Sequence, residues 1–295
     1  MPATMIHGTS HHYQLTARTA CPWVLVFLHG WLLSRTYWQP LIESLAPDFC
    51  CLSYDLRGFG ESVEPAIAKS EAGAENYMPR TYAQDLGELL AQLEISEAWL
   101  VGHSLGGEVA LWSAALWPDR VKGVTCLGVG GGIYFKEEFE RFRSVGQQLL
   151  QVRRSWLGYV PGIEQWFARA NVQQPLDPSW GRQRLQDFLG ADRSAALGTL
   201  FGLTAEQEVH RLPRLVANLS QPAYFLAGQQ DPIMESQYVR HLASFHPLFQ
   251  EQCGANFIEL ANCGHLPMLE QTEQVADQVR GCMMAHQGTT IGLGS

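Results

Sequence analysis

A serine flanked by glycines two residues to either side lies in the sequence Val-Gly-His-Ser-Leu-Gly-Gly, from Val101 to Gly107. This G-x-S-x-G spacing is typical of a sharp turn between a strand and a helix, which lifts the serine hydroxyl clear of the backbone. Gly102 and Gly106 suit the turn because a Cβ at either position would strike the neighbouring strand or helix. The motif therefore predicts a nucleophile, Ser104, between a buried strand and the start of a helix.

The residues on both sides of Ser104 have the patterns that such a turn needs. The apolar run 98–101 before it is typical of a strand. After it, the small residues Gly106, Ala110 and Ala114 recur at helical spacing and predict a helix over 105–116, with one face that packs closely on a sheet. A bare G-x-S-x-G also arises by chance in a chain with 28 glycines, so the flanking strand and helix give the motif its weight.

Apolar runs of strand length alternate with helical patterns along the rest of the chain. Strands are expected at 23–28, 50–54, 121–129, 223–227 and 256–260; helices are expected around 38–45, from a capping box of Thr81 and Gln84, and over 235–244 and 270–284. The alternation predicts an α/β fold with a mainly parallel sheet, covered by helices on both faces. We also expect an edge hairpin with exposed histidines in residues 1–20, a solvated loop from Ser62 to Arg80, and a disordered glycine-rich tail from His286.

The segment from Ile133 to about Ala205 has a different pattern. Strand-like alternation is absent, helical spacing appears, and aromatic residues recur at Phe135, Phe139, Phe142, Trp156, Tyr159, Trp166, Phe167, Trp180, Phe188 and Phe201. This predicts a helical cap or lid, residues 133–205, inserted into a core domain of residues 1–132 and 206–295. The aromatic side chains are expected to form a small core of the cap and the apolar wall of a pocket.

Polar residues follow the ends of several expected strands. His29, Asp55, Ser104, Asp231 and His265 each come just after one of them. The carboxyl ends of parallel strands meet at one edge of a sheet, and sites form at that edge in such folds. We therefore expect these side chains to lie at the same edge.

Ser104 needs a base, because a serine hydroxyl is a weak nucleophile until its proton is removed. His265 lies in a Gly-His loop after the last strand and is the candidate base. Asp231, after the preceding strand, is the candidate carboxylate that orients the imidazole and stabilises its charged form. The order serine, aspartate, histidine is the one that a strand–serine–helix fold of this kind uses.

The tetrahedral intermediate of acyl transfer needs two N–H donors. We expect the backbone N–H of Leu105, at a helix N-terminus whose dipole favours negative charge, and that of Trp31, in the loop after the first buried strand. His29, Gly30 and His103 are expected to position the site without transferring protons.

Two glycine-rich stretches are expected to be loops. In the first, Asp55 and Arg57 are expected to form an ion pair that orders residues 55–62, with substrate binding by these charges as the alternative. The second, Gly130 to Gly132, lacks the G-x-G-x-x-G spacing of a dinucleotide site, so NAD binding is not expected.

The charge balance and the cysteines limit the partners. A net charge of −9 disfavours nucleic acid and anionic membrane surfaces, and no apolar run is long enough to cross a membrane. The seven cysteines are odd in number, and several lie in apolar runs. They are interpreted as buried thiols in a reducing compartment, the cytoplasm, and their spacing supports no metal site. The oligomeric state is left open between a monomer and a dimer.

Several motifs together resemble the α/β-hydrolase superfamily, over residues 23–132 and 213–285. They are Phe27-Leu28-His29-Gly30-Trp31, Asp55-x-Arg57-Gly58-x-Gly60-x-Ser62, Gly102-His103-Ser104-Leu105-Gly106-Gly107, Gly228-x-x-Asp231 and Gly264-His265. The stretch 29–33 with Trp38 is similar to cofactor-free bacterial esterases and perhydrolases, and the stretch 264–270 to C–C bond and enol-lactone hydrolases. The resemblance implies the α/β-hydrolase fold and a serine triad of Ser104, Asp231 and His265.

The leading hypothesis is a serine hydrolase that cleaves a carboxylic ester of a small-to-medium apolar substrate through an acyl-enzyme, without a metal or cofactor. An alternative on the same triad is a C–C bond hydrolase or enol-lactonase, for which Arg141, Arg143, Arg153 and Arg154 are candidates to bind a substrate carboxylate. Epoxide hydrolase and haloalkane dehalogenase chemistry needs a carboxylate nucleophile, which Ser104 excludes. A slow small-molecule receptor is the alternative from another class.

Overall fold

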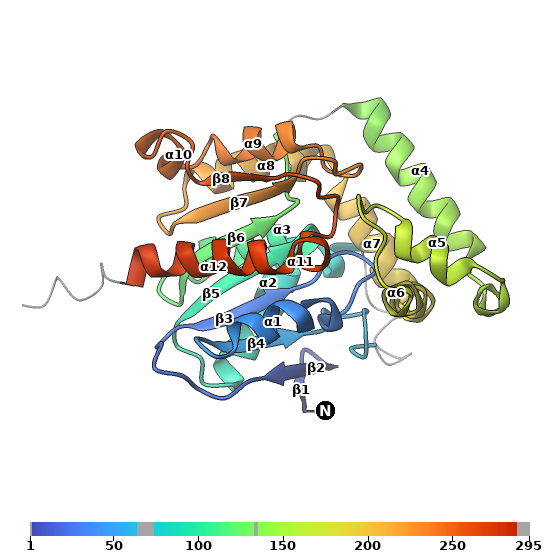
Figure 1. Cartoon of the computed structure of the whole chain (residues 1–295), viewed down its shortest axis with the longest axis horizontal. Coiled ribbons are helices and arrows are strands. Elements are labelled where there is room, and N and C mark those ends of the chain that lie inside the picture. The colour runs from blue at the N-terminus through green and yellow to red at the C-terminus, as the bar shows by residue number, and fades with distance from the viewer. Residues whose placement is uncertain (1, 64–73, 133–134, 288–295) are drawn as a thin grey trace, which may run out of the picture.

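The protein is described here by a computed structural model that covers residues 2–63, 74–132 and 135–287. The strands of these residues form one eight-stranded sheet in the order β1-β2-β4-β3-β5-β6-β7-β8 (Figure 1). They are β1 (Ala3–Ile6), β2 (Thr9–Leu15), β3 (Val24–Leu28), β4 (Cys50–Tyr54), β5 (Ala98–His103), β6 (Val121–Leu127), β7 (Ala223–Gly228) and β8 (Phe257–Leu260). β1 pairs with β2 and β2 with β4 in antiparallel fashion, and β3 to β8 pair in parallel.

Helices cover both faces of the sheet, as predicted. One face packs against α2 (Pro79–Gln92), α3 (Leu105–Leu116), α8 (Glu206–Ala217) and α9 (Ser236–Ala243); the other packs against α1 (Gln39–Leu45), α11 (Pro267–Glu270) and α12 (Thr272–Gln287). The short helices η1 (Arg35–Trp38), η3 (Ala74–Tyr77) and α10 (Pro247–Glu251) lie in the connections.

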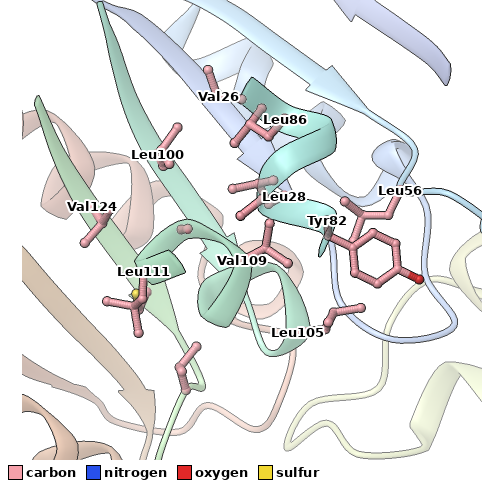
Figure 2. Close-up of a cluster of buried hydrophobic side chains, with 14 of the residues drawn as sticks. Val26, Leu28, Leu56, Tyr82, Leu86, Leu100, Leu105, Val109, Leu111 and Val124 are labelled. Atoms are coloured by element: carbon pink, nitrogen blue, oxygen red, sulfur yellow. The ribbon is translucent and has the colours of Figure 1, made fainter. Parts of the chain in front are cut away.

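The central strands are apolar throughout because both of their faces are buried. Along β3, Val26 and Leu28 point to the face of α2 and α3, whereas Leu25 and Phe27 point to the face of α1 and α12. Figure 2 shows Val26, Leu28 and Leu100 on the sheet, close to side chains of the covering helices. Burial of each such side chain stabilises the fold by roughly 1.5–3 kcal/mol.

The segment between β6 and β7 is helical and contains α4 (Lys136–Val152), η4 (Ser155–Tyr159), α5 (Ile163–Arg169), α6 (Pro178–Gly190) and α7 (Arg193–Leu203). We call α4 to α7 the inserted helices. They form a group to one side of the sheet (Figure 1). Contacts of Trp31 with Ala196 and of His265 with Asn171 show that this side is the carboxyl edge of the parallel strands.

Two local predictions at the N-terminal half were wrong. α2 begins at Pro79 rather than after a capping box at Thr81: proline suits the first helical position because it lacks an N–H, and the Thr81 hydroxyl donates instead to the carbonyl of Glu75. His11 is buried rather than exposed, because β2 turns it inward, and its Nδ1 lies 3.2 Å from the carbonyl oxygen of Asp55.

Other boundaries also differ from the predictions. Tyr77 was expected in a solvated loop but is buried against α7. Residues 64–73 of the predicted loop lie outside the described residues. α12 continues to Gln287, and His286 stacks on Trp99; the predicted tail beyond it lies outside the described residues. All seven cysteines are free, and Cys253 is exposed rather than buried.

Candidate active site

Ser104 occupies a strained turn between β5 and α3. Its backbone lies at φ 51° and ψ −118°, and its N–H donates to the carbonyl of Leu127 on the neighbouring strand at 2.9 Å. A Cβ on Gly106 would lie 2.1 Å from the carbonyl oxygen of Leu28, and one on Gly102 would lie 2.3 Å from that of Gly106. These contacts confirm the steric reason predicted for both glycines. Positive φ at a serine is a strain that proteins keep mainly at functional sites.

His265 and Asp231 meet at the ends of β8 and β7. His265 Nδ1 lies 2.7 Å from Asp231 Oδ2, and Asp231 Oδ1 accepts the N–H groups of Ile233 and Met234. Because the aspartate oxygen only accepts, Nδ1 of His265 carries the proton and Nε2 is left as the basic nitrogen. This is the tautomer that a general base needs.

Gly128 shows that this pair lies beside Ser104. A Cβ on Gly128 would lie 3.4 Å from His265 Cε1 and 3.5 Å from Asp231 Oδ2. Gly128 directly follows Leu127, whose carbonyl binds the Ser104 N–H. The structure therefore brings the three predicted residues together around the end of β6.

His103 contacts both the backbone and the ring of His265. Its Nε2 lies 2.7 Å from the His265 carbonyl oxygen and must donate to it, and the two rings meet edge to face at 4.7 Å. Burial, followed by the neighbouring His265, holds the pKa of His103 well below its usual range. The neutral ring of His103 therefore donates to the carbonyl of His265, and its positioning role stays a prediction.

His29 joins the loop after β3 to the loop after β4. Its Nδ1 donates to the carbonyl of Gly30 at 2.9 Å, and its Nε2 accepts the N–H of Leu56 at 2.9 Å. Burial lowers the pKa of His29, so the ring keeps this neutral form. Gly30 is packed against His103, since a Cβ there would lie 2.6 Å from His103 Nδ1. The contacts of His29 and Gly30 therefore fix the loop that carries Trp31.

The predicted oxyanion donors are Leu105 and Trp31. Among the described residues, neither of their backbone N–H groups has a protein acceptor. Leu105 is the first residue of α3, where the helix dipole adds positive potential. The Trp31 indole N–H donates to the Ala196 carbonyl of α7 at 2.9 Å, which fixes the residue against the inserted helices.

The ion pairs around this loop differ from the prediction. Asp55 is bound by the guanidinium and the backbone N–H of Arg35, from η1. Arg57 reaches across to Asp85 of α2, with Nη2 and Oδ2 2.6 Å apart. Asp55 and Arg57 were expected to pair with each other. They bind Arg35 and Asp85 instead, which the packing of η1 and α2 brings close.

The arginines proposed for a substrate carboxylate are placed unfavourably. Arg143 is hydrogen-bonded to Thr204, and Arg153 donates to the carbonyls of Phe188 and Ala191. Arg141 and Arg154 are exposed. Within the described residues, moreover, no group of three or more His, Cys, Asp or Glu side chains is placed to hold a metal ion. No helix in that part of the chain is long and apolar enough to cross a membrane.

Glu270, to which the sequence analysis gave no role, lies next to His265. Its carboxylate accepts the backbone N–H groups of Gly264, Leu266 and Gln173. The sequence signal for this role of Glu270 is its position in the first turn of a helix, because an acid there can reach back to the N–H groups before that helix.

Comparison with known proteins identifies the family. The sequence matches the family model described as the alpha/beta hydrolase fold over residues 24–272. An epoxide hydrolase from Caballeronia sordidicola is 29% identical over 92% of this chain and 90% of its own. A 2-succinyl-6-hydroxy-2,4-cyclohexadiene-1-carboxylate synthase from Enterobacter sp. is 30% identical over 71% of this chain and 76% of its own.

Solved structures agree with the sequence matches. A thermophilic esterase from Thermogutta terrifontis, solved with malate bound, has a TM-score of 0.75 and 25% identity, over 97% of each chain. A family model that spans most of the chain and a structural match over nearly its whole length point to one conclusion. The chain belongs to the α/β-hydrolase fold family and is a hydrolase.

Proposed function

We propose that this protein is a serine hydrolase that cleaves a carboxylic ester of a small-to-medium apolar substrate through an acyl-enzyme. The observation that carries the proposal is the arrangement of His265, held at 2.7 Å by Asp231, beside the strained turn of Ser104. The N–H of Leu105, the residue after the serine, has no protein acceptor among the described residues, which supports its role as an oxyanion donor.

In the proposed mechanism, His265 takes the proton of Ser104 as the hydroxyl attacks the ester carbonyl carbon. Asp231 stabilises the imidazolium that forms, and the N–H groups of Leu105 and Trp31 stabilise the oxyanion. His265 then gives the proton to the leaving alkoxide, and the alcohol departs. A water molecule, deprotonated by the same histidine, cleaves the acyl-enzyme and returns Ser104 to its starting state.

The nucleophile argues against epoxide hydrolysis, although relatives of this chain carry that name. A carboxylate that opens an epoxide forms an ester, which water can then cleave. Ser104 would form an alkyl ether, which is stable to such hydrolysis. C–C bond or enol-lactone cleavage on the same residues is the second candidate, and the internal hydrogen bonds of Arg143 and Arg153 count against two of its candidate carboxylate ligands.

We further propose that residues 133–205 act as a cap over the site. Trp31, Tyr82 and His265 of the core each have a hydrogen-bond partner in this segment, at Ala196, Thr199 and Asn171. Its helices therefore bound the space in front of Ser104, and their side chains would select the substrate. The free thiols favour a reducing compartment, the cytoplasm.

Hydrolysis of p-nitrophenyl esters from acetate to decanoate tests the proposal. We expect turnover of several esters by the wild type and a loss of more than about 10³-fold in kcat/KM for Ser104→Ala. Ser113→Ala is the matched control, because Ser113 lies on the same helix and its hydroxyl donates only to the Val109 carbonyl within that helix. Its activity should match the wild type.

Two outcomes would contradict the ester hypothesis. If Ser104→Ala keeps the wild-type rate, Ser104 is not the nucleophile. If the wild type cleaves none of the esters, a C–C hydrolase or a receptor becomes the better explanation. A small molecule that stays bound without turnover would then favour the receptor.

A further inference from the structure

The backbone of His265 is held from several directions at once. Its own N–H donates to the carbonyl of Asn171 at 2.8 Å, and its carbonyl accepts from His103 Nε2 at 2.7 Å. The N–H groups of the residues before and after it, Gly264 and Leu266, donate to Glu270 at 2.9 and 3.0 Å. Every peptide group around the imidazole thus has a fixed partner.

One of these bonds comes from the connection between α5 and α6, and another residue of the same connection binds Glu270. Asn171 lies in the connection between α5 and α6, and the next residues of that connection reach Glu270: the Gln173 N–H donates to Oε2 at 2.7 Å. The same oxygen accepts the Gly264 N–H. Oε2 of Glu270 therefore accepts from both the segment 171–173 and the loop that carries His265.

The close approach of the two segments is built into the sequence. A Cβ on Gly264 would lie 2.8 Å from both the Gln173 nitrogen and the Val172 Cα, so this glycine lets the backbones touch. Asn171 has φ 60°, a left-handed conformation that asparagine tolerates better than most residues. In this conformation its carbonyl accepts the His265 N–H.

We propose that Glu270 is a positioning residue that ties the segment 171–173 to the catalytic histidine, so that His265 is held in its working position only while the inserted helices are closed on the core. This inference rests on the proposed function, because it needs His265 to be the base. Glu270 itself touches none of the proposed reacting atoms. It acts through the backbone of the histidine loop, and opening of the inserted helices would remove the Asn171 and Gln173 bonds together.

The charge of Glu270 matters because three N–H groups share its two oxygens. Glutamine in its place keeps one accepting oxygen and faces the remaining donors with an NH₂ group. Alanine removes all of the acceptors. The structure therefore predicts a graded series, with wild type above Glu270→Gln and Glu270→Gln above Glu270→Ala.

The first readout is kinetic. We expect kcat for ester hydrolysis to fall on the order of 10²-fold in Glu270→Ala and about tenfold in Glu270→Gln, with KM within about threefold, since a displacement near 1 Å of a catalytic group has this effect. Gly264→Ala should lower kcat in the same way. Glu273→Ala is the matched control, because Glu273 is exposed on the next helix and, within the described part of the chain, binds only the Ser44 hydroxyl; it should keep wild-type kinetics.

The second readout does not depend on activity. Hydrogen exchange of peptides that span 170–176 and 261–267 should become faster in both segments together in Glu270→Ala, and stay unchanged in Glu273→Ala. Unchanged exchange in both segments, or a kcat within twofold of wild type in a folded Glu270→Gln and Gly264→Ala, would overturn the proposal. If no ester is hydrolysed by the wild type, the exchange experiment still decides whether Glu270 joins the segments, and only the proposed function fails.

Discussion

Asp187 gives the structure a measurable pH dependence. It lies on α6 with 8% of its surface exposed, and it accepts hydrogen bonds from Ser34 in the loop after β3 and from Gln183, each at 3.1 Å. Burial raises the pKa of its carboxyl from 3.8 to about 6. The folded protein therefore keeps a proton on Asp187 at pH values where the unfolded chain has lost it.

The size of the effect follows from this difference. Each tenfold change in proton affinity corresponds to about 1.4 kcal/mol, so the raised pKa corresponds to roughly 3 kcal/mol. Because the pKa is raised in the folded state, Asp187 contributes most to the free energy of unfolding below about pH 4. This contribution is lost as the pH rises through 6. Asp187→Asn cannot ionise, and any hydrogen bond that it loses changes the free energy of unfolding equally at all pH values. The variant should therefore gain roughly 2 kcal/mol on the wild type between pH 4 and pH 7, the part of the full effect that falls in this range.

Urea unfolding at a series of pH values measures this difference between Asp187→Asn and the wild type. Asp177→Asn is the control on the same helix, because Asp177 accepts from the Ser179 hydroxyl and N–H at the helix start, and these bonds lower its pKa. The wild type should therefore gain on that variant as the pH rises, which is the opposite sign. A difference for Asp187→Asn that stays constant within about 0.5 kcal/mol from pH 4 to 7 would refute the reasoning.

Two further predictions concern stability. Asp55→Ala should lower the free energy of unfolding by about 2–4 kcal/mol, because the buried Arg35 guanidinium loses this carboxylate while it keeps its pair with Glu61, and the backbone N–H groups of Arg35 and Glu61 lose their acceptor; urea unfolding checks this, and a loss below 1 kcal/mol would contradict it. Gly106→Ala places a Cβ 2.1 Å from the Leu28 carbonyl oxygen, a contact that no side-chain rotation relieves. It should cost about 3 kcal/mol or more and abolish ester hydrolysis, whereas a stable and active variant would show that the turn can relax.

The sheet and the candidate site were largely predictable from sequence because their signals are local. Six apolar runs predicted the parallel strands β3 to β8, and the helix over 105–116 has the predicted limits. Residues that follow the ends of parallel strands must meet at one edge, so topology alone brought Ser104, Asp231 and His265 together. No knowledge of side-chain packing was needed for this step.

The errors have the opposite origin. Asp55 and Arg57 are close in sequence, and proximity suggested a pair, but Arg35 and Asp85 reach them from η1 and α2. These partners are fixed by how the elements pack, which no local pattern encodes. His11 shows the same limit, since a histidine on an edge hairpin is exposed or buried according to the element that covers its strand.

The contacts of Glu270 depend on both its local sequence and the packing of distant elements. Its place after the Gly-His loop is visible in the sequence, but its bond to Gln173 depends on how the segment between α5 and α6 is laid against the core. In the proposed mechanism the core alone supplies the nucleophile, the base and the orienting acid, whereas the backbone N–H of His265 binds Asn171 from the connection between α5 and α6. The proposal therefore predicts that a change in the inserted helices that admits a new substrate keeps its gain in binding only if residues 171–173 stay in place, and otherwise lowers kcat. Substitutions that alter specificity without this loss are expected on α4, α6 and α7, away from this connection.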